Sequence, residues 1–261
     1  MGEKIRPSAA RGRIHTMDEL RGFAVFCMVF YHGFYTLAYL YHVQAGMVLL
    51  RFFMPAEPWF AGLFMLISGI SSDLSHSNLA RGFKLFGVAL AVTLVTYLAV
   101  PEDLIVFGIL HFLSVCMILY GLLKPFADRF RFSWVAVAAC ALLFLLTRGV
   151  PLGYVGLSPR LGVLLPGSLS QAGWLFPLGI YGSDFVSADY FPLFPWIFVF
   201  AAGTVLGKLA AQGRFPAFLY PSRVPFFSWM GRRALVIYLV HQPVIYGVCW
   251  AVSELAKLLR G

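Results

Sequence analysis

Arg21 and His32 are the two residues whose types and spacing are best suited to chemistry in this sequence. The arginine enters a long apolar segment, and the histidine follows eleven residues later inside the same segment. Eleven residues of α-helix span about three turns and roughly 16 Å, so the two side chains return to nearly the same face. We therefore predict one helix with a permanent cation at the membrane boundary and a titratable imidazole deeper in the membrane.

The chemistry expected of this pair follows from the residue types. An ionisable group inside a membrane is costly and usually functional, which favours His32 as a general base or nucleophile over a histidine that only bridges helices. A planar, always charged guanidinium suits phosphate oxygens, although Arg21 could instead anchor the helix in the lipid headgroups. Asp18 lies three residues before Arg21 and can pair with it at the helix start.

Three further residues are candidates for the same site. His111, in Phe107-Gly108-Ile109-Leu110-His111, is predicted at a depth similar to that of His32. His241, in Tyr238-Leu239-Val240-His241-Gln242-Pro243, is either catalytic or a structural bridge near a proline that frees a backbone carbonyl. Asp189 is expected at the outer mouth of the sixth segment, where it either binds an acceptor or caps that helix.

The composition shows which elements must position these residues. Of 261 residues, 60% are hydrophobic and only 12% are charged, with a mean hydropathy of +0.82, which indicates a polytopic membrane protein. The first apolar run is long, contains a histidine and lacks a small-residue cleavage site, so it is not read as a cleaved signal peptide. The four cysteines show no paired spacing, so we expect reduced core cysteines and no metal site. The net charge of +9 is distributed as membrane topology predicts, and nucleic acid is not an expected partner.

The predicted fold is an all-α polytopic membrane protein with about seven transmembrane helices plus a Gly/Pro-rich re-entrant or interfacial segment. The apolar segments long enough to span a bilayer are 20–41, 58–75, 83–100, 104–123, 133–149, 191–209 and 234–253. Turn or charged sequences such as Pro55-Ala56-Glu57-Pro58 are predicted to interrupt them. Residues 150–190 are apolar but rich in glycine and proline, so we expect no eighth span there.

The distribution of cations predicts the orientation. With the N-terminus in the cytoplasm, most of the twenty Lys and Arg residues fall on the cytoplasmic side, as the positive-inside rule requires. We predict a flexible basic cytoplasmic tail at 1–15, a single transmembrane domain at 16–261, and a bacterial inner (plasma) membrane location.

Several of these stretches together resemble a known family. Arg13-Ile14-His15 with Asp18-Glu19-Leu20-Arg21-Gly22 and His32, then Leu66-Ile67-Ser68-Gly69, then the motifs around His111, Asp189 and His241 occur in order from about residue 13 to 250. They are similar to the bacterial members of the heparan-α-glucosaminide N-acetyltransferase catalytic family, the DUF1624-type transmembrane acyltransferases. The spacing of Arg21 and His32 also resembles the Arg-x10-His signature of the wider transmembrane acyltransferase group.

The resemblance implies that an acetyl group passes from cytosolic acetyl-CoA to a hydroxyl or amine of a sugar or glycan-like acceptor across the lipid bilayer. Independently of the resemblance, the estimated depths in the membrane place the thioester near the candidate catalytic residues His32, His111 and His241, and the acceptor would enter from the outer side past Asp189. The CoA phosphates would be bound by cations that are expected at the cytoplasmic ends of helices, namely Arg21, Arg81, Lys84, Arg232 and Arg233. Asp18 would support this binding. The family's catalytic histidine follows the first span, where His42 is the nearest counterpart; because its neighbours differ from the family pattern, His32 is kept as the candidate.

Two alternatives to an acyltransferase stay open at this stage. One is a small transporter or proton-coupled carrier that uses the buried histidines as relays. The absence of a convincing internal repeat weighs against it. The other is a catalytically silent membrane scaffold. A homodimer is one assembly state to be tested, and the acceptor, the acyl chain length and the choice between direct transfer and an acetyl-histidine intermediate are left open.

Overall fold

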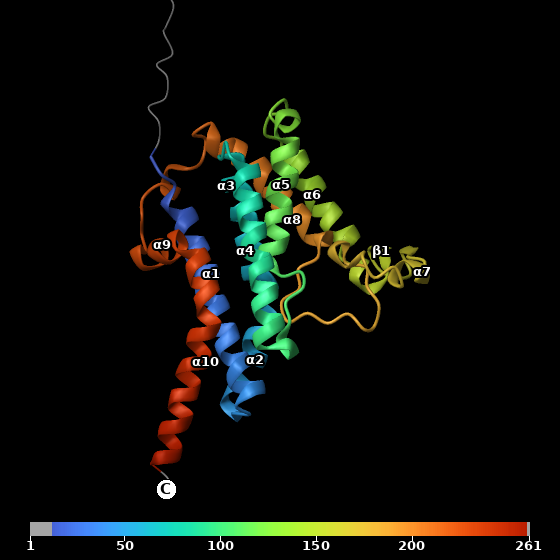
Figure 1. Ribbon diagram of the computed structural model, residues 1–261. Helices are drawn as coiled ribbons and strands as arrows, with labels where there is room; N and C mark the ends of the chain where they lie inside the picture. Colours follow the sequence, from blue (N-terminus) through green and yellow to red (C-terminus); the bar gives the residue numbers. More distant parts are fainter. Residues whose placement is uncertain (1–11, 260–261) are drawn as a thin grey trace, which may run out of the picture. The chain divides into compact units, whose positions relative to one another are not determined.

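The computed structural model describes residues 12–259, and nearly all of its regular structure is helical (Figure 1). Within this part of the chain, seven helical stretches are long and apolar enough to cross a membrane: His15–Leu40, Gln44–Asp73, Asn78–Ala99, Ile109–Ala127, Trp134–Leu152, Leu193–Ala211 and Ala234–Leu258. The chain is therefore an all-α polytopic membrane protein, as predicted. Residues 1–11 of the predicted basic tail lie outside the described residues.

The chain forms two compact units, which are described separately. Unit 1 comprises residues 1–64 and 215–261, and unit 2 comprises residues 65–214. The boundary between them falls within one helix, α3 (Glu57–Asp73).

Unit 1 is built on the first and last long helices. Its other elements are η1 (Thr36–Leu40), α2 (Gln44–Phe53), η2 (Met54–Ala56), the first half of α3, η6 (Ala217–Leu219) and α9 (Pro225–Arg232). The first helix, α1 (His15–Tyr35), packs against α9 and against α10 (Ala234–Leu258), as Figure 1 shows. Buried side chains such as Val25 and Met230 close the core between them.

Two glycines allow α1 and α9 to touch backbone to backbone. A Cβ added to Gly22 would overlap the carbonyl oxygen of Phe227 and lie 2.8 Å from the amide nitrogen of Gly231. A Cβ added to Gly231 would overlap the carbonyl oxygen of Asp18. Small residues at such crossings are how membrane helices approach closely. This contact fixes α9 beside the charged start of α1.

The predicted interruption at Pro55-Ala56-Glu57-Pro58 was wrong. In the structure α2, η2 and α3 follow one another from Gln44 to Asp73 without a turn. Pro55 lies in the first turn of η2, and Pro58 is the second residue of α3. A proline in the first turn of a helix removes no hydrogen bond that the helix would otherwise make, so both prolines are accommodated.

Unit 2 contains two closely packed helix pairs. Its elements are the second half of α3, α4 (Asn78–Ala99), η3 (Pro101–Asp103), α5 (Ile109–Ala127), α6 (Trp134–Thr147), η4 (Val150–Leu152), β1 (Tyr154–Gly156), β2 (Gly162–Leu164), α7 (Gly167–Ser170), η5 (Phe176–Leu178) and α8 (Leu193–Ala211). Helix α4 packs against α5 and α6 packs against α8. A Cβ on Gly69 would overlap the carbonyl oxygen of Phe200, so α3 also meets α8 at backbone contact.

Charged side chains join the ends of α3, α5 and α8. Both Lys124 and Lys208 lie within 3.9 Å of Asp73 Oδ1, and Tyr120 donates a hydrogen bond to the same oxygen. The two lysines also donate to the last carbonyls of helices, Lys124 to Asp73 O and Lys208 to Ala127 O. The cluster thus satisfies helix-end carbonyls that have no partner within their own helix.

Residues 150–190 form the irregular segment that was predicted. It holds the antiparallel β1–β2 hairpin, in which Tyr154 pairs with Leu164, and the four-residue helix α7. None of its helices is long enough to span a bilayer.

Candidate active site

Arg21 and His32 both lie on α1, which is helical without interruption from His15 to Tyr35. The predicted single helix with an arginine near its start and a histidine farther along is therefore confirmed. The helix continues into a turn of π-helix, η1. Such turns are rare and are found frequently at functional sites.

The imidazole of His32 lies against that of His241 from α10. Their ring centroids are 4.9 Å apart and their planes are inclined by 53°. His241 is buried, with 7% of its surface exposed, and His32 is half-buried. Unit 1 therefore brings together two of the three histidines predicted from the sequence, from helices at opposite ends of the chain.

The hydrogen bonding of His241 fixes which of its nitrogens can act as a base. Its Nδ1 lies 2.6 Å from the carbonyl oxygen of Tyr238. A carbonyl only accepts hydrogen bonds, so Nδ1 carries the proton and Nε2 of a neutral ring carries the lone pair. Nε2 is buried and has no hydrogen-bond partner among the described residues. The backbone carbonyl on the preceding helical turn thus orients the ring with its basic nitrogen available.

Asp18 holds the cations at the start of α1. Its Oδ1 lies 3.3 Å from Arg21 Nη1, and its Oδ2 lies 2.6 Å from Arg13 Nε. The hydrogen bond with Asp18 raises the pKa of Arg13, which keeps that guanidinium charged. Asp18 itself is buried, so its carboxylate orients Arg21 while part of the arginine stays accessible.

Glu19 helps to hold the site together, although no role was predicted for it from the sequence. Its Oε1 accepts hydrogen bonds from Ser222 Oγ and from the backbone N–H groups of Arg223 and Val224, at 2.6 to 2.9 Å. These N–H groups precede α9, so the buried carboxylate attaches the start of that helix to α1. Its position one residue after Asp18 was the only available signal, because its partners lie some 200 residues away.

The remaining predicted phosphate-binding residues divide between the units. Arg232 and Arg233 end α9 and precede α10, and both are exposed. Arg233 lies over the ring of Trp229, with 4.9 Å between its guanidinium carbon and the ring centroid. Because Gly231 touches Asp18, unit 1 places these cations near the start of α1. Arg81 and Lys84 are exposed in the first two turns of α4, in unit 2.

His111 lies in unit 2, in the first turn of α5, where its tautomer is also fixed. Thr93 Oγ1 uses its single proton to donate to Ile105 O at 2.7 Å, so it accepts a hydrogen bond from His111 Nε2 at 3.2 Å. Nδ1 then carries the lone pair, and it is buried with no hydrogen-bond partner among the described residues. The predicted contact between His111 and His32 stays a prediction. The lone pair on Nδ1, which would let His111 act as a base, follows from contacts within unit 2 alone.

Asp189 caps the start of α5. The alternative to acceptor binding that the sequence offered was a cap on a different helix, the sixth predicted segment, which is α8. The Oδ2 atom of Asp189 accepts a hydrogen bond from the N–H of Ile109, the first residue of α5, at 3.1 Å. A side chain at Gly108 would overlap this carboxylate. The parallel bridge between Phe107 and Tyr190 places the two segments side by side, which explains why the cap serves the earlier helix.

Replacement of Asp189 separates the cap from acceptor binding. Asp189→Ala is expected to destabilise the protein by about 1 kcal/mol, because an N-terminal N–H of α5 loses its acceptor. Asp189→Asn keeps an accepting oxygen and should restore most of the melting temperature measured in detergent. An Asn variant with a normal melting temperature but a raised KM for acceptor would assign the charge to acceptor binding, whereas an unchanged KM would leave only the cap.

No group of three or more His, Cys, Asp or Glu side chains is arranged to hold a metal ion within residues 12–259. The expectation that the protein needs no metal stays a prediction.

Comparisons with known proteins place these residues in a family context. The family model described as heparan-alpha-glucosaminide N-acetyltransferase, catalytic, matches residues 13–243. The matched region includes Arg21, His32, His111, Asp189 and His241. No curated protein and no solved structure gave a match.

Proposed function

This chain belongs to the heparan-alpha-glucosaminide N-acetyltransferase catalytic family, and on that premise we propose that it moves an acetyl group from cytosolic acetyl-CoA to a hydroxyl or amine of a glycan-like acceptor. Membership and the seven apolar helices make it a multi-pass membrane acyltransferase. The acetyl-CoA donor, the acceptor at the outer side of the membrane, the cytoplasmic N-terminus and the bacterial inner membrane are parts of the proposal.

The observation that carries the chemistry is the contact between His32 and His241 inside a membrane-spanning unit. Nε2 of His241 takes a proton from the acceptor hydroxyl or amine as that atom attacks the thioester carbonyl. A bond forms between the acceptor and the acetyl carbon, the carbon–sulfur bond breaks, and the thiolate of CoA receives the proton from the imidazolium. His32, in contact with the same ring, positions the acceptor or shares the proton.

The cations of unit 1 fit the other end of the donor. CoA carries phosphates that require positive charge, and Arg21 presents a guanidinium already oriented by Asp18. About three helical turns separate Arg21 from His32, which suits an extended pantetheine arm between phosphate and thioester. Arg232 and Arg233 add positive charge beside the same helix start, and Arg81 and Lys84 are the proposed contributors from unit 2.

Binding of acetyl-CoA tests this proposal directly. Purified full-length protein in detergent is expected to bind acetyl-CoA saturably and to transfer acetyl to an added amino sugar. Arg21→Ala should weaken acetyl-CoA binding by about tenfold or more, and Arg21→Lys should restore it only in part, because a point charge lacks the planar fork.

Arg160→Ala is the matched control, because it removes one exposed cation from the segment between α6 and α8. It should bind acetyl-CoA as the wild type does. A wild-type protein without saturable acetyl-CoA binding would refute the acyltransferase proposal, and equal weakening in Arg160→Ala would remove the specific role of Arg21.

A further inference from the structure

The charged side chains of unit 2 are divided unequally between its two ends. Helices α3, α5 and α8 end on one side, and α4 and α6 begin there. A hydrogen bond of 2.9 Å from Lys208 Nζ to Ala127 O ties the ends of α8 and α5 together. This side, called the basic end, carries seven of the nine Lys and Arg residues of unit 2: Arg81, Lys84, Lys124, Arg129, Arg131, Lys208 and Arg214. It carries only two of the six carboxylates of the unit, Asp73 and Asp128.

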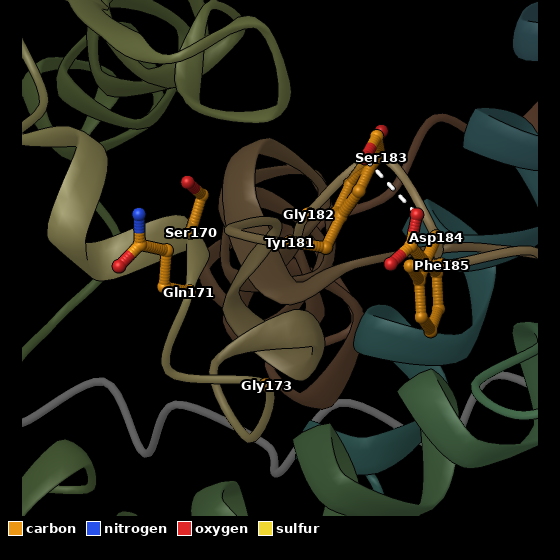
Figure 2. A pocket seen from close by; sticks show the side chains of 8 residues that line it. All are labelled: Ser170, Gln171, Gly173, Tyr181, Gly182, Ser183, Asp184 and Phe185. Atoms are coloured by element: carbon orange, nitrogen blue, oxygen red, sulfur yellow. Dashed lines mark hydrogen bonds between the residues drawn. The ribbon is translucent and has the colours of Figure 1, made fainter.

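The opposite end of unit 2 has the reverse balance of charge. There the irregular segment between α6 and α8 contains a cavity of about 610 Å³, whose one charged lining residue is Asp184. Figure 2 shows this carboxylate beside Ser183, which donates a hydrogen bond to it at 3.1 Å. The two cations of this end, Arg148 and Arg160, are outnumbered by the other four carboxylates of the unit. Unit 2 therefore attracts an anionic ligand at its basic end and not at this one.

Two of the cations at the basic end are already neutralised. Lys124 Nζ lies 3.9 Å from Asp73 Oδ1 and 2.9 Å from Asp128 Oδ1. Lys208 Nζ lies 3.7 and 4.0 Å from the same two oxygens. The unbalanced charge therefore belongs to the other five cations, which are exposed and pair with no carboxylate in the described part of the chain: Arg81, Lys84, Arg129, Arg131 and Arg214.

The connection between α5 and α6 alternates cations with aromatic rings, in the order Arg129, Phe130, Arg131, Phe132. The side chains of Phe130 and Trp134 are more than half exposed, at 56% and 68%. The two helices that the connection joins are both long and apolar enough to cross a membrane, so the connection lies where a span ends and the next begins. Basic and aromatic side chains together at that level are typical of contact with lipid head groups.

Backbone hydrogen bonds hold this connection in a tight turn. The N–H of Arg129 donates to Phe126 O and that of Phe130 donates to Ala127 O, both at 3.1 Å. The ring of Phe130 also packs on that of Phe126, with 5.0 Å between their centroids. The turn therefore presents its cations and rings in a fixed order, and little conformational entropy is lost when a ligand binds.

We propose that this aromatic–basic turn, residues 126–134, binds a phospholipid with an anionic head group. Arg129 and Arg131 attract the phosphate and the net negative charge of the head group. Phe130 and Trp134 pack on the glycerol and the upper parts of the acyl chains. In the orientation proposed above this turn faces the cytoplasm, and the cytoplasmic leaflet is the one whose surface is negatively charged.

Lipid binding at the turn is independent of the acyltransferase function. Arg81 and Lys84, which are the proposed contributors to CoA binding from unit 2, are not needed for it. A wild-type protein without saturable acetyl-CoA binding would refute the acyltransferase proposal and leave the lipid site standing.

Native mass spectrometry of the full-length protein in detergent measures the binding. Phosphatidylglycerol and phosphatidylcholine with the same acyl chains are the two probes. The wild type is expected to bind phosphatidylglycerol about tenfold more tightly, since each cation near an anionic head group contributes about fivefold. A higher concentration of ammonium acetate should reduce this preference, because salt screens exposed charges.

Substitutions in the turn separate the charges from the rings. Arg129→Gln combined with Arg131→Gln should weaken phosphatidylglycerol binding by about tenfold and leave phosphatidylcholine binding unchanged, whereas lysine at both positions should keep most of the preference. Phe130→Ser should weaken both lipids by about threefold and keep the preference, because it removes apolar contact alone. Arg160→Gln, which removes an exposed cation from the opposite end, should match the wild type.

Three results would overturn the lipid site. One is a wild-type protein that binds the two lipids equally. Another is a preference that survives in the double arginine variant, or that falls as much in Arg160→Gln as in Arg131→Gln. The third is displacement of bound phosphatidylglycerol by acetyl-CoA or by glycerol phosphate, which would make the turn a site for soluble phosphates.

Discussion

His241→Asn is expected to lower acetyl transfer by about 10²- to 10⁴-fold while leaving the fold and acetyl-CoA binding nearly intact, because that is the usual contribution of a positioned general base. The asparagine amide can still donate to Tyr238 O, as Nδ1 of the histidine does. It has no basic nitrogen in place of Nε2. The variant therefore removes the proposed base and retains the hydrogen bond that a purely structural histidine would need.

The matched control for this substitution is His76→Asn, which changes an exposed histidine to which no role is assigned. Both proteins should be purified in the same detergent and compared by melting temperature, acetyl-CoA affinity and rate of transfer. If His241→Asn transfers acetyl at the wild-type rate, His241 is not the base. If it loses stability together with activity, the structural interpretation of His241 is the better one.

The contact between the two rings adds a test of coupling. Residues that act as one catalytic unit show strongly non-additive losses, so His32→Asn combined with His241→Asn should lose little more activity than the worse single variant. Independent losses that multiply would mean that the two histidines serve separate steps despite the 4.9 Å between their ring centroids.

The residues that form each membrane-spanning helix could be predicted from the sequence, but the side-chain contacts between helices could not. Apolar length located seven spans, and eleven-residue spacing located Arg21 and His32 on one helix, because both patterns are local. The contact of His32 with His241 joins positions 209 residues apart, and no local pattern encodes it. Estimated depth made both His111 and His241 candidate partners of His32, and the packing of α1 on α10 within unit 1 brings His241 into contact with it.

Polar groups near helix ends were the hardest to place. Asp189 was considered as the cap of the helix that follows it, whereas it caps α5, about 80 residues earlier in the chain, because a bridge at Phe107 brings the two segments together. Glu19 received no role, because its backbone partners before α9 are visible only in three dimensions. Carboxylates that bind distant N–H groups leave no periodic trace in a sequence.

Gly231→Ala and Gly22→Ala are each expected to destabilise unit 1 strongly, by about 3 kcal/mol or more, at the upper end of what overpacking usually produces. The methyl group added at either position would overlap a backbone carbonyl oxygen of the facing helix, that of Asp18 or of Phe227. A backbone atom cannot rotate away as a flexible side chain can. Helices α1 and α9 must therefore separate, and the hydrogen bonds from the start of α9 to Glu19 would be strained with them.

Gly33→Ala is the internal control, because Gly33 lies on the same helix and a Cβ there would meet nothing within 4 Å. It should be neutral or slightly stabilising, since alanine favours helix over glycine by about 1 kcal/mol. Melting temperatures in one detergent measure the contrast, and a Gly231→Ala protein as stable as Gly33→Ala would show that α1 and α9 do not pack at backbone contact. That contact also places Arg232 and Arg233 beside the start of α1. Gly231→Ala protein that remains folded should therefore bind acetyl-CoA more weakly than folded Gly33→Ala protein does.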